Sequence, residues 1–219
     1  MKLYIVRHGE TKWNREHILQ GQLDSPLTEK GIGGAKKIKK SIENIAFAKV
    51  YTSQQKRAIA TTEIILEDRN NKNYTIDTNI TEMSYGSWQG KSQEEICKDP
   101  ESTQMYMNYF KYPEKYIPVS GGETFEEIMK RAEIFLSKLK EEHDENDVII
   151  AVTHGTFIKA MFTMVKNKGL EEFWDKPNIT NCSISILEIS KDGIEITHEA
   201  DDSHLGEHAL AITETDYIK

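Results

Sequence analysis

A continuous apolar run at residues 148–152 constrains the fold of this chain more than any other feature. The run reads Val-Ile-Ile-Ala-Val and contains no polar residue. A strand that is buried on both faces has this pattern, whereas a half-buried strand alternates apolar and polar residues. Two further strand-like runs lie at residues 2–6 and 49–53. The sequence therefore predicts a sheet with parallel strands and a covered central strand.

Amphipathic helices are predicted between these strands. Apolar residues recur at spacings of three and four between residues 35 and 45, 58 and 66, 125 and 139, and 157 and 165. Thr28 is placed to cap the first of these helices. Alternating strands and helices favour an α/β three-layer sandwich, with a mixed, mostly parallel sheet and helices on both faces.

Two further segments complete the predicted organisation. Residues 183–189 and 193–197 flank Lys191-Asp192-Gly193, which is typical of a hairpin. Residues 84–122 break the strand and helix rhythm with many Tyr and Trp residues and three prolines. We interpret residues 84–122 as a lid insertion over the site within a single domain, residues 1–219. Tyrosines 106–116 favour packing, although any that face the substrate would favour esters with an apolar or aromatic part.

Composition excludes several classes of partner. The chain of 219 residues carries a formal net charge of -8, so it has no electrostatic footprint for nucleic acid or an anionic membrane. The first residues are too short for a signal peptide, and no apolar run approaches a membrane span. We therefore expect a cytoplasmic protein whose partner is a small molecule. Any anion must be bound by a few local cations.

Neither the cysteines nor the C-terminal histidines predict a metal site. Cys97 and Cys182 are far apart and form no CxxC pair, so each is expected to be a buried apolar side chain. His204 and His208 have the four-residue spacing of a helical metal pair, but the HExxH glutamate is missing. We interpret them as part of a surface tail, and expect neither metal nor cofactor.

Cationic and imidazole side chains follow three of the predicted strands. Arg7-His8-Gly9 ends the first, Ser53 leads to Arg57 after the second, and Thr153-His154-Gly155 ends the third. Ligands of open α/β sheets bind beyond the carboxyl ends of the strands, so these groups should converge at one rim. The helix after Gly155 would add free N–H groups there. Because the arginine fork matches phosphate oxygens, the sequence predicts a phosphate site.

Several motifs resemble, in order, the signature of the histidine phosphatase (phosphoglycerate mutase-like) superfamily, on its phosphatase-like branch. They run from the first strand to the third and cover most of the chain. The motifs are Arg7-His8-Gly9-Glu10-Thr11 with Trp13-Asn14, Gln20-Gly21-Gln22, Asp24-Ser25-Pro26-Leu27-Thr28 with Gly31, Ser53 with Arg57-Ala58 and Thr61, Glu82 with Tyr85-Gly86-Ser87-Trp88-Gln89-Gly90, Gly121-Gly122-Glu123-Thr124, and Val152-Thr153-His154-Gly155.

The resemblance implies a role for each residue type. A neutral His8 would attack phosphorus, and Arg7, Arg57 and His154 would neutralise charge on the transferring group. Glu82 would donate a proton to the leaving oxygen and later activate water. The resemblance also implies that a substrate pocket is lined by Asn14, Gln20, Gly21 and the backbone near Gly155.

Structural interpretations of the same residues stay open. His8 and His154 could be core histidines, Arg57 a cation at a helix start, and Asn14 and Gln20 turn residues. Within the ordered motif series, catalysis is the stronger reading for both histidines.

The predicted activity is that of a metal-independent phosphoric monoester hydrolase that acts on small phosphorylated metabolites through a phosphohistidine. A phosphoglycerate mutase would use the same His8 but transfer the phosphoryl group to a second hydroxyl. Gln20-Gly21-Gln22 and Glu82-Met83-Ser84-Tyr85-Gly86 favour the phosphatase branch over the mutase pattern. A non-catalytic phosphate-binding regulatory module is a further alternative, although neither the histidine nor an arginine is missing. The individual ester and the oligomeric state, including a homodimer, stay open.

Overall fold

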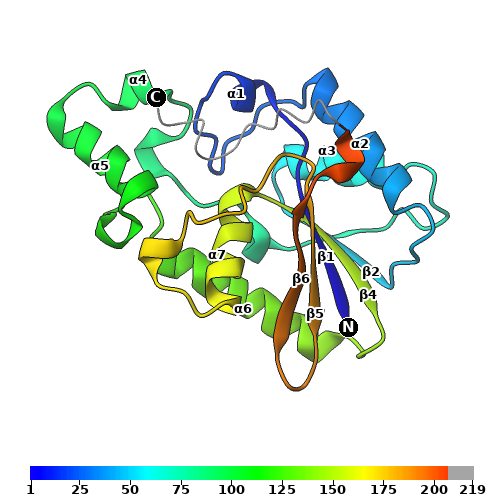
Figure 1. Cartoon of the computed structure of the whole chain (residues 1–219). Helices are drawn as coiled ribbons and strands as arrows, with labels where there is room; N and C mark the ends of the chain where they lie inside the picture. Colours follow the sequence, from blue (N-terminus) through cyan, green and yellow to red (C-terminus); the bar gives the residue numbers. More distant parts are fainter. Residues whose placement is uncertain (207–219) are drawn as a thin grey trace.

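A six-stranded sheet forms the centre of the protein (Figure 1). The computed structural model describes residues 1–206, so His208 of the C-terminal histidine pair lies outside the described residues. The strand order is β3-β2-β4-β1-β5-β6. The strands are β1 (Lys2–Arg7), β2 (Lys49–Thr52), β3 (Thr75–Ile76), β4 (Val148–Thr153), β5 (Ile184–Ile189) and β6 (Ile194–Asp201).

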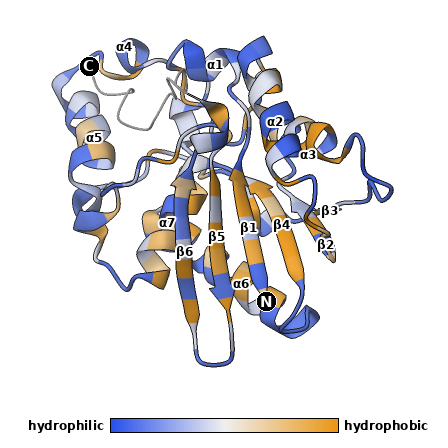
Figure 2. Ribbon diagram, turned by 45° about the vertical axis from the view of Figure 1, so that its right-hand side comes forward, coloured by the Kyte–Doolittle hydropathy of each residue, from blue (hydrophilic) through white to orange (hydrophobic). Residues whose placement is uncertain are grey.

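The apolar run at residues 148–152 forms most of β4, as predicted. This strand is parallel to β1 on one side and to β2 on the other. Its residues are almost all buried, and Figure 2 shows the strand as nearly uniformly hydrophobic. The antiparallel strands β5 and β6 complete the sheet at the other edge of β1. The prediction of a mixed, mostly parallel sheet is therefore confirmed.

Helices cover both faces of this sheet. Helices α2 (Glu29–Ser41) and α3 (Lys56–Leu66) lie on one face, and α6 (Phe125–Glu142) and α7 (Gly155–Val165) lie on the other (Figure 1). Side chains of β4 alternate between two cores. Ile150 and Val152 pack in one cluster with α2 and α3, and Ile149 and Ala151 pack in the other with α6 and α7. This arrangement confirms the three-layer prediction.

Side-chain caps start the long helices where the sequence predicts them. The Thr28 hydroxyl accepts a hydrogen bond from the Gly31 N–H at 3.0 Å, as expected for the first residue before α2. Before α6, Thr124 and Glu127 form a reciprocal capping box. Helix α7 has no side-chain cap at His154, so its first N–H groups keep their hydrogen-bonding capacity for the site.

The hairpin prediction is confirmed, with one correction to its length. Strand β6 continues to Asp201, four residues beyond the predicted end at residue 197, and irregular pairing accompanies the extension. The register of pairing between β5 and β6 shifts in this stretch. Here the Ala200 N–H donates a hydrogen bond to the Ser185 hydroxyl and not to a strand carbonyl. His204, just after β6, donates its Nε2–H to the Cys182 carbonyl at 3.0 Å.

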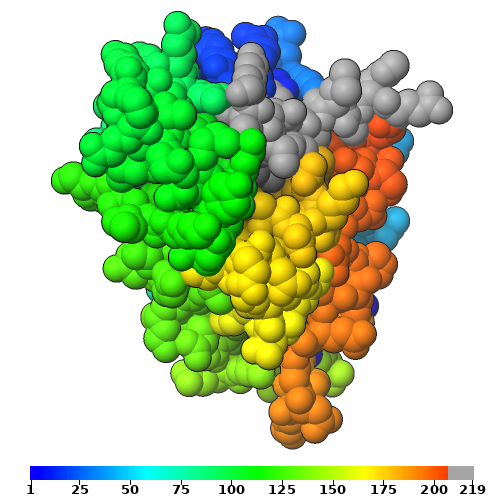
Figure 3. Space-filling view, turned by 60° about the vertical axis from the view of Figure 1, so that its left-hand side comes forward, coloured from blue at the N-terminus to red at the C-terminus, as the bar shows by residue number. Residues whose placement is uncertain are grey.

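The region at residues 84–122 folds as short helices joined by turns. It contains the 3₁₀ helices η2 (Gly86–Trp88) and η3 (Pro113–Lys115), and α4 (Gln93–Ile96) and α5 (Pro100–Lys111), which Figure 1 shows at the upper left of the molecule. Its surface abuts the segment after α7 (Figure 3), where the Trp174 indole N–H donates to the Tyr109 carbonyl at 2.6 Å. A short helix, α1 (Lys12–Arg15), lies at the top of the view in Figure 1. Among residues 1–206, no helix has the length and apolarity to cross a membrane.

Candidate functional site

The three predicted strand ends meet at one end of the sheet. Because Arg7 of β1 is in register with Thr153 of β4, the residues that follow them emerge side by side. The His8 N–H donates to the Thr153 carbonyl at 2.9 Å. The ring centroids of His8 and His154 are 5.1 Å apart. Sheet topology thus brings together side chains that are nearly 150 residues apart in sequence.

The geometry of His8 selects one tautomer of its imidazole. Nδ1 lies 2.7 Å from the Gly9 carbonyl oxygen, which can only accept, so Nδ1 carries the proton. Nε2 therefore keeps its lone pair, and Arg57 Nε–H donates to it at 3.2 Å. Burial, reinforced by Arg57 and Arg7, holds the pKa of His8 well below its ordinary value of 6.5. The ring is consequently neutral at physiological pH.

Arg57 is buried, and its guanidinium donates hydrogen bonds to a neighbouring loop of the protein. Nη2 donates to the Gly21 carbonyl at 2.7 Å, and Nη1 donates to the Leu23 carbonyl at 2.6 Å and to Asp24 Oδ1 at 3.0 Å. The side chain is 1% exposed. Burial lowers the pKa of Arg57 from its usual value, and Asp24 and Glu82 oppose this change. The guanidinium stays charged and is aimed at His8.

Arg7 and Asn181 tie the segment that precedes β5 to the loop that carries His8. Arg7 Nη1 donates to the Ile179 carbonyl, and Asn181 Nδ2 donates to the His8 carbonyl at 3.1 Å. Both side chains are buried. Asn181 was not among the predicted site residues. No local pattern marks it, because its contact depends on the return of the chain to β1.

Glu82 lies on a segment that is neither helix nor strand. Oε1 accepts from the Met83 N–H at 2.9 Å, and Oε2 accepts from the Thr156 N–H at the start of α7 at 3.4 Å. The residue is 8% exposed. Burial raises the pKa of Glu82 above 4.5, although the Met83 N–H and the two arginines oppose the change. A raised pKa favours a carboxyl group that can hold a proton.

A small cavity of about 40 Å³ joins these groups. All predicted site residues except His154 and Gly155 line it. The lining residues are Arg7, His8, Asn14, Leu19, Gln20, Gly21, Arg57, Glu82, Tyr85, Tyr109, Phe110 and Thr156. A larger groove of about 760 Å³ between α2 and α3 also touches Arg57, but it reaches neither His8 nor Glu82. We place the site in the smaller cavity because it contains both His8 and Glu82, which the groove does not reach.

The predicted pocket residues Asn14, Gln20 and Gly21 already have structural contacts. Asn14 Oδ1 accepts from the Thr11 hydroxyl at 3.0 Å, and Gln20 Oε1 accepts from the Ser25 hydroxyl at 3.2 Å. Gly21 has a backbone φ of 53°, a left-handed conformation that favours glycine. Asn14 therefore caps the start of α1, whereas Gln20 and Gly21 belong to the loop that holds Arg57. The contact of all three residues with a substrate stays a prediction.

His154 lies behind His8 rather than on the cavity wall. It is fully buried, and its Nε2 is 2.8 Å from the Ser53 hydroxyl and 3.0 Å from Gln55 Oε1. Burial, followed by Arg57 and His8, holds the pKa of His154 well below 6.5. The imidazole is therefore neutral, and its predicted role towards the phosphoryl group stays a prediction. Gly155 begins α7, immediately before the cavity residue Thr156.

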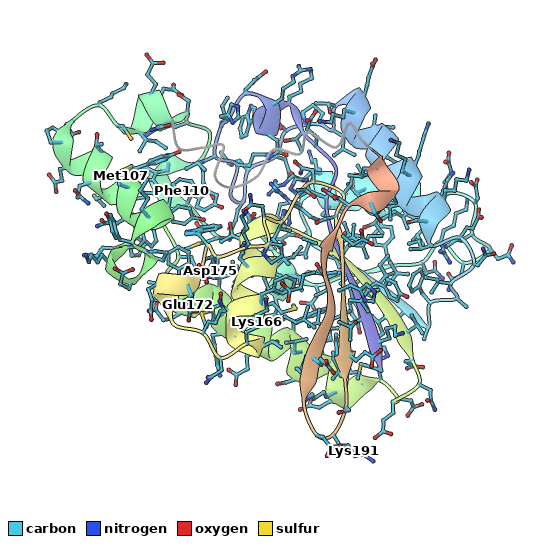
Figure 4. The ribbon with its side chains drawn as sticks, in the orientation of Figure 1. Met107, Phe110, Lys166, Glu172, Asp175 and Lys191 are labelled. Carbon is cyan, nitrogen blue, oxygen red and sulfur yellow. The ribbon has the colours of Figure 1, made fainter. Side chains whose placement is uncertain are left out.

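Aromatic residues also reach the cavity, among them Tyr109, which the sequence assigned mainly to packing. Tyr85 and Tyr109 point their hydroxyls to Thr156 Oγ1 at distances of 2.7 and 3.3 Å. Phe110, labelled in Figure 4, directly follows Tyr109 near the end of α5 and also lines the cavity. The aromatic composition of residues 84–122 indicated such a contact, but not which rings would make it. Among residues 1–206, no group of three or more His, Cys, Asp or Glu is placed to hold a metal ion.

Comparison with known proteins agrees with this geometry. The family model "Histidine phosphatase superfamily (branch 1)" matches residues 3–202. A putative phosphoserine phosphatase 2 of Hydrogenobacter thermophilus is 32% identical over 90% of this chain and 92% of its own. An adenosylcobalamin/alpha-ribazole phosphatase of Salmonella typhimurium is 28% identical over 80% of this chain and 84% of its own.

A solved structure shares the whole architecture. Bacillus stearothermophilus YhfR superposes with a TM-score of 0.85 at 34% identity, covering 93% of this chain and 98% of that chain. The family match spans every strand of the sheet and every group that meets at the cavity. The chain therefore belongs to branch 1 of the histidine phosphatase superfamily and is a phosphatase, a phosphoric monoester hydrolase.

Proposed function

We propose that the protein hydrolyses small phosphate monoesters by passing the phosphoryl group through His8, without a metal. The observation that carries this proposal is the state of His8. Its Nδ1–H is held by the Gly9 carbonyl and its Nε2 lone pair faces the cavity arginine. A buried, neutral imidazole with one fixed tautomer is a nucleophile that needs no separate base.

In the first step, His8 Nε2 attacks phosphorus while the ester oxygen departs. Arg57 Nε, which contacts Nε2 in this structure, turns its N–H to a phosphate oxygen when the ester enters. Arg7 and Arg57 then stabilise charge on the transferring group, and neutral His154 supports the His8 ring. The protonated Glu82 donates its proton to the leaving oxygen, so an alcohol departs and a carboxylate remains.

In the second step, water attacks the phosphohistidine. The Glu82 carboxylate takes a proton from this water, the N–P bond breaks, and inorganic phosphate is released. His8 and the protonated Glu82 are restored together, because each step reverses the proton position left by the other. A carboxyl group that acts first as an acid and then as a base needs a raised pKa. Burial raises the pKa of Glu82 in this way.

We further propose that residues 84–122 act as a lid. The cavity of about 40 Å³ is far smaller than the roughly 300–1,000 Å³ of typical small-molecule sites. A bulky ester therefore needs a wall to move, and Tyr109 and Phe110 bring α5 into that wall. The names of two relatives suggest phosphoserine and α-ribazole phosphate as first candidates, and the aromatic lining favours esters with an apolar part.

The test is a phosphate-release screen on a panel of esters that includes phosphoserine, α-ribazole phosphate, 3-phosphoglycerate and p-nitrophenyl phosphate. We expect release of phosphate that EDTA does not reduce, and an acid-labile phosphoryl group on His8 after rapid quenching. Isomerised phosphoglycerate without net phosphate release would identify a mutase. Binding without turnover would identify a regulatory module, and metal-restored activity after EDTA would overturn the metal-free mechanism.

A further inference from the structure

Glu82 is carried by main chain that lacks regular secondary structure. It lies between the 3₁₀ helices η1 (Thr78–Ile80) and η2, outside every strand of the sheet. No ladder of strand hydrogen bonds therefore fixes the direction of its side chain. A general acid must nevertheless stay within about 3 Å of the oxygen that it protonates. Some other feature has to hold this segment in place.

The guanidinium of Arg131 on α6 holds the segment from one side. Nη1 donates to the Thr81 carbonyl at 3.0 Å and also to the Asn79 carbonyl. Nη2 reaches the carbonyl of Glu82 itself at 3.5 Å. These contacts lie immediately before the carboxyl group that lines the cavity, so the arginine sets the path of the main chain at that point.

Glu123 holds the same segment from the other side. Its N–H donates to the Ser84 carbonyl at 2.9 Å, and its Oε2 accepts from the Ser84 N–H at 3.2 Å. Glu123 also forms a two-pronged ion pair with Arg131, with Nε–Oε1 at 2.7 Å and Nη2–Oε2 at 2.8 Å. The two side chains are only 13% and 19% exposed. A sheltered, bidentate pair is stronger and more directional than a surface ion pair.

We propose that Glu123 and Arg131 are positioning residues that hold Glu82 in its reactive place. Together they fix residues 79–81 and residue 84, which leaves Glu82 bracketed by the ion pair. The argument rests on the proposed acid role of Glu82. Neither residue lines the cavity, so both act through the main chain and not on the substrate.

The test compares R131K with R69K. Lysine keeps the charge at residue 131 but cannot hold several carbonyls and both Glu123 oxygens at once. Arg69 is a matched control because its guanidinium also donates to two carbonyls, those of Ile42 and Ile45, each at 2.7 Å, away from the cavity. We expect R131K to lower kcat/KM for an alkyl phosphate by about 10- to 100-fold, because misplaced groups lose catalysis steeply. For p-nitrophenyl phosphate the loss should be less than about threefold, because this leaving group hardly needs the acid. R69K should change neither value.

A double variant separates positioning from general damage. If Arg131 acts through Glu82, E82Q/R131K should be no slower on the alkyl ester than E82Q alone. E123Q should repeat the ester preference of R131K, and it carries the test if R131K does not fold. Equal losses on both esters, or additive losses in the double variant, would overturn the positioning role. If E82Q itself shows no ester preference, the acid role is wrong and the positioning role is overturned with it.

Discussion

The cavity at the carboxyl ends of the strands and the aromatic cluster beside it are built on opposite principles. The cavity holds the charged and imidazole groups, and its lining residues come from segments between residues 7 and 156 that meet only in the folded chain. The cluster consists of rings from residues 85–125 with Phe173 and Trp174, many in edge-to-face contact at centroid distances near 5 to 6 Å. Chemistry and stability are therefore expected to reside in different neighbouring regions.

The physical reason lies in the free energy of burial. Buried arginines, imidazoles and a carboxyl group lose the free energy of hydration that they have in the unfolded chain. Their hydrogen bonds within the protein mainly offset this loss and add little net stability to the fold. Buried rings gain free energy from the area they remove from water and from favourable ring geometry. Substitutions in the two regions should separate accordingly into losses of turnover and losses of stability.

The largest effect is expected for His8→Ala. Removal of the nucleophile should lower kcat by at least about 10⁴-fold, as no other group in the cavity can carry the phosphoryl group. The fold should survive, because β1 keeps its pairing with β4 and β5. Turnover and circular dichroism of the purified variant measure both. A folded variant with near wild-type activity would falsify the mechanism.

Trp88→Ala tests the other side of the comparison. The indole packs against Tyr106, Tyr109 and Tyr116, so its removal should lower the free energy of unfolding by about 3–5 kcal/mol. Below the unfolding transition, kcat should stay within about tenfold of wild type, since Trp88 does not line the cavity. Urea denaturation and steady-state kinetics provide the two measurements. A stable variant without turnover would show that the cluster takes part in the chemistry.

Glu82→Gln should separate esters by their leaving groups. The amide keeps the shape but cannot donate the proton, so kcat/KM should fall by about 10²-fold or more for an alkyl phosphate. Loss for p-nitrophenyl phosphate should stay within about tenfold, because nitrophenolate departs almost unaided. The comparison uses kcat/KM, which covers the steps through the first transfer. Similar losses for both esters would assign the proton to another group.

The pH dependence should follow from the two opposite pKa shifts. Burial lowers the pKa of His8 below 6.5, so the nucleophile stays neutral, and active, as the pH falls through 6.5. Burial raises the pKa of Glu82 above 4.5, and its acid form is lost as the pH rises through the raised value. For an alkyl ester, kcat/KM should thus be highest between the lowered pKa of His8 and the raised pKa of Glu82, and decline above the latter.

Profiles of wild type and E82Q between about pH 4 and about pH 9 check this expectation. The alkaline decline should disappear in E82Q, while the acid limb set by His8 remains. An alkaline decline that persists unchanged in E82Q would mean that another group supplies the proton.

The smallest effect is expected for Tyr109→Phe, which lies at the border of the two regions. The change removes one hydroxyl but keeps the ring, and Tyr85 and Thr156 retain their own contact at 2.7 Å. We expect a loss of about 1 kcal/mol in the free energy of unfolding. Turnover should change by about twofold or less. A loss of turnover comparable with that of His8→Ala would place the hydroxyl in the chemistry.

Much of the fold could be predicted because it depends on local patterns. The apolar run at residues 148–152, the spacing of apolar residues in α6 and the cap at Thr28 each identify one element. The rule that parallel strands share a carboxyl edge then brings His8, Arg57 and His154 to one end. The buried neutral state of His154 could not be predicted, because its pKa depends on neighbours from three separate segments.

The sequence by itself determined which chemical groups this protein has and at which end of its sheet they meet. Hydrophobic periodicity and strand-end motifs are local, and parallel topology converts them into one place. Only the tertiary structure decided the tautomer of His8, the loop that holds Arg57, and the ion pair of Glu123 and Arg131 that brackets Glu82. Hydrogen-bond geometry and desolvation depend on distances between segments remote in sequence, and no local pattern contains those distances.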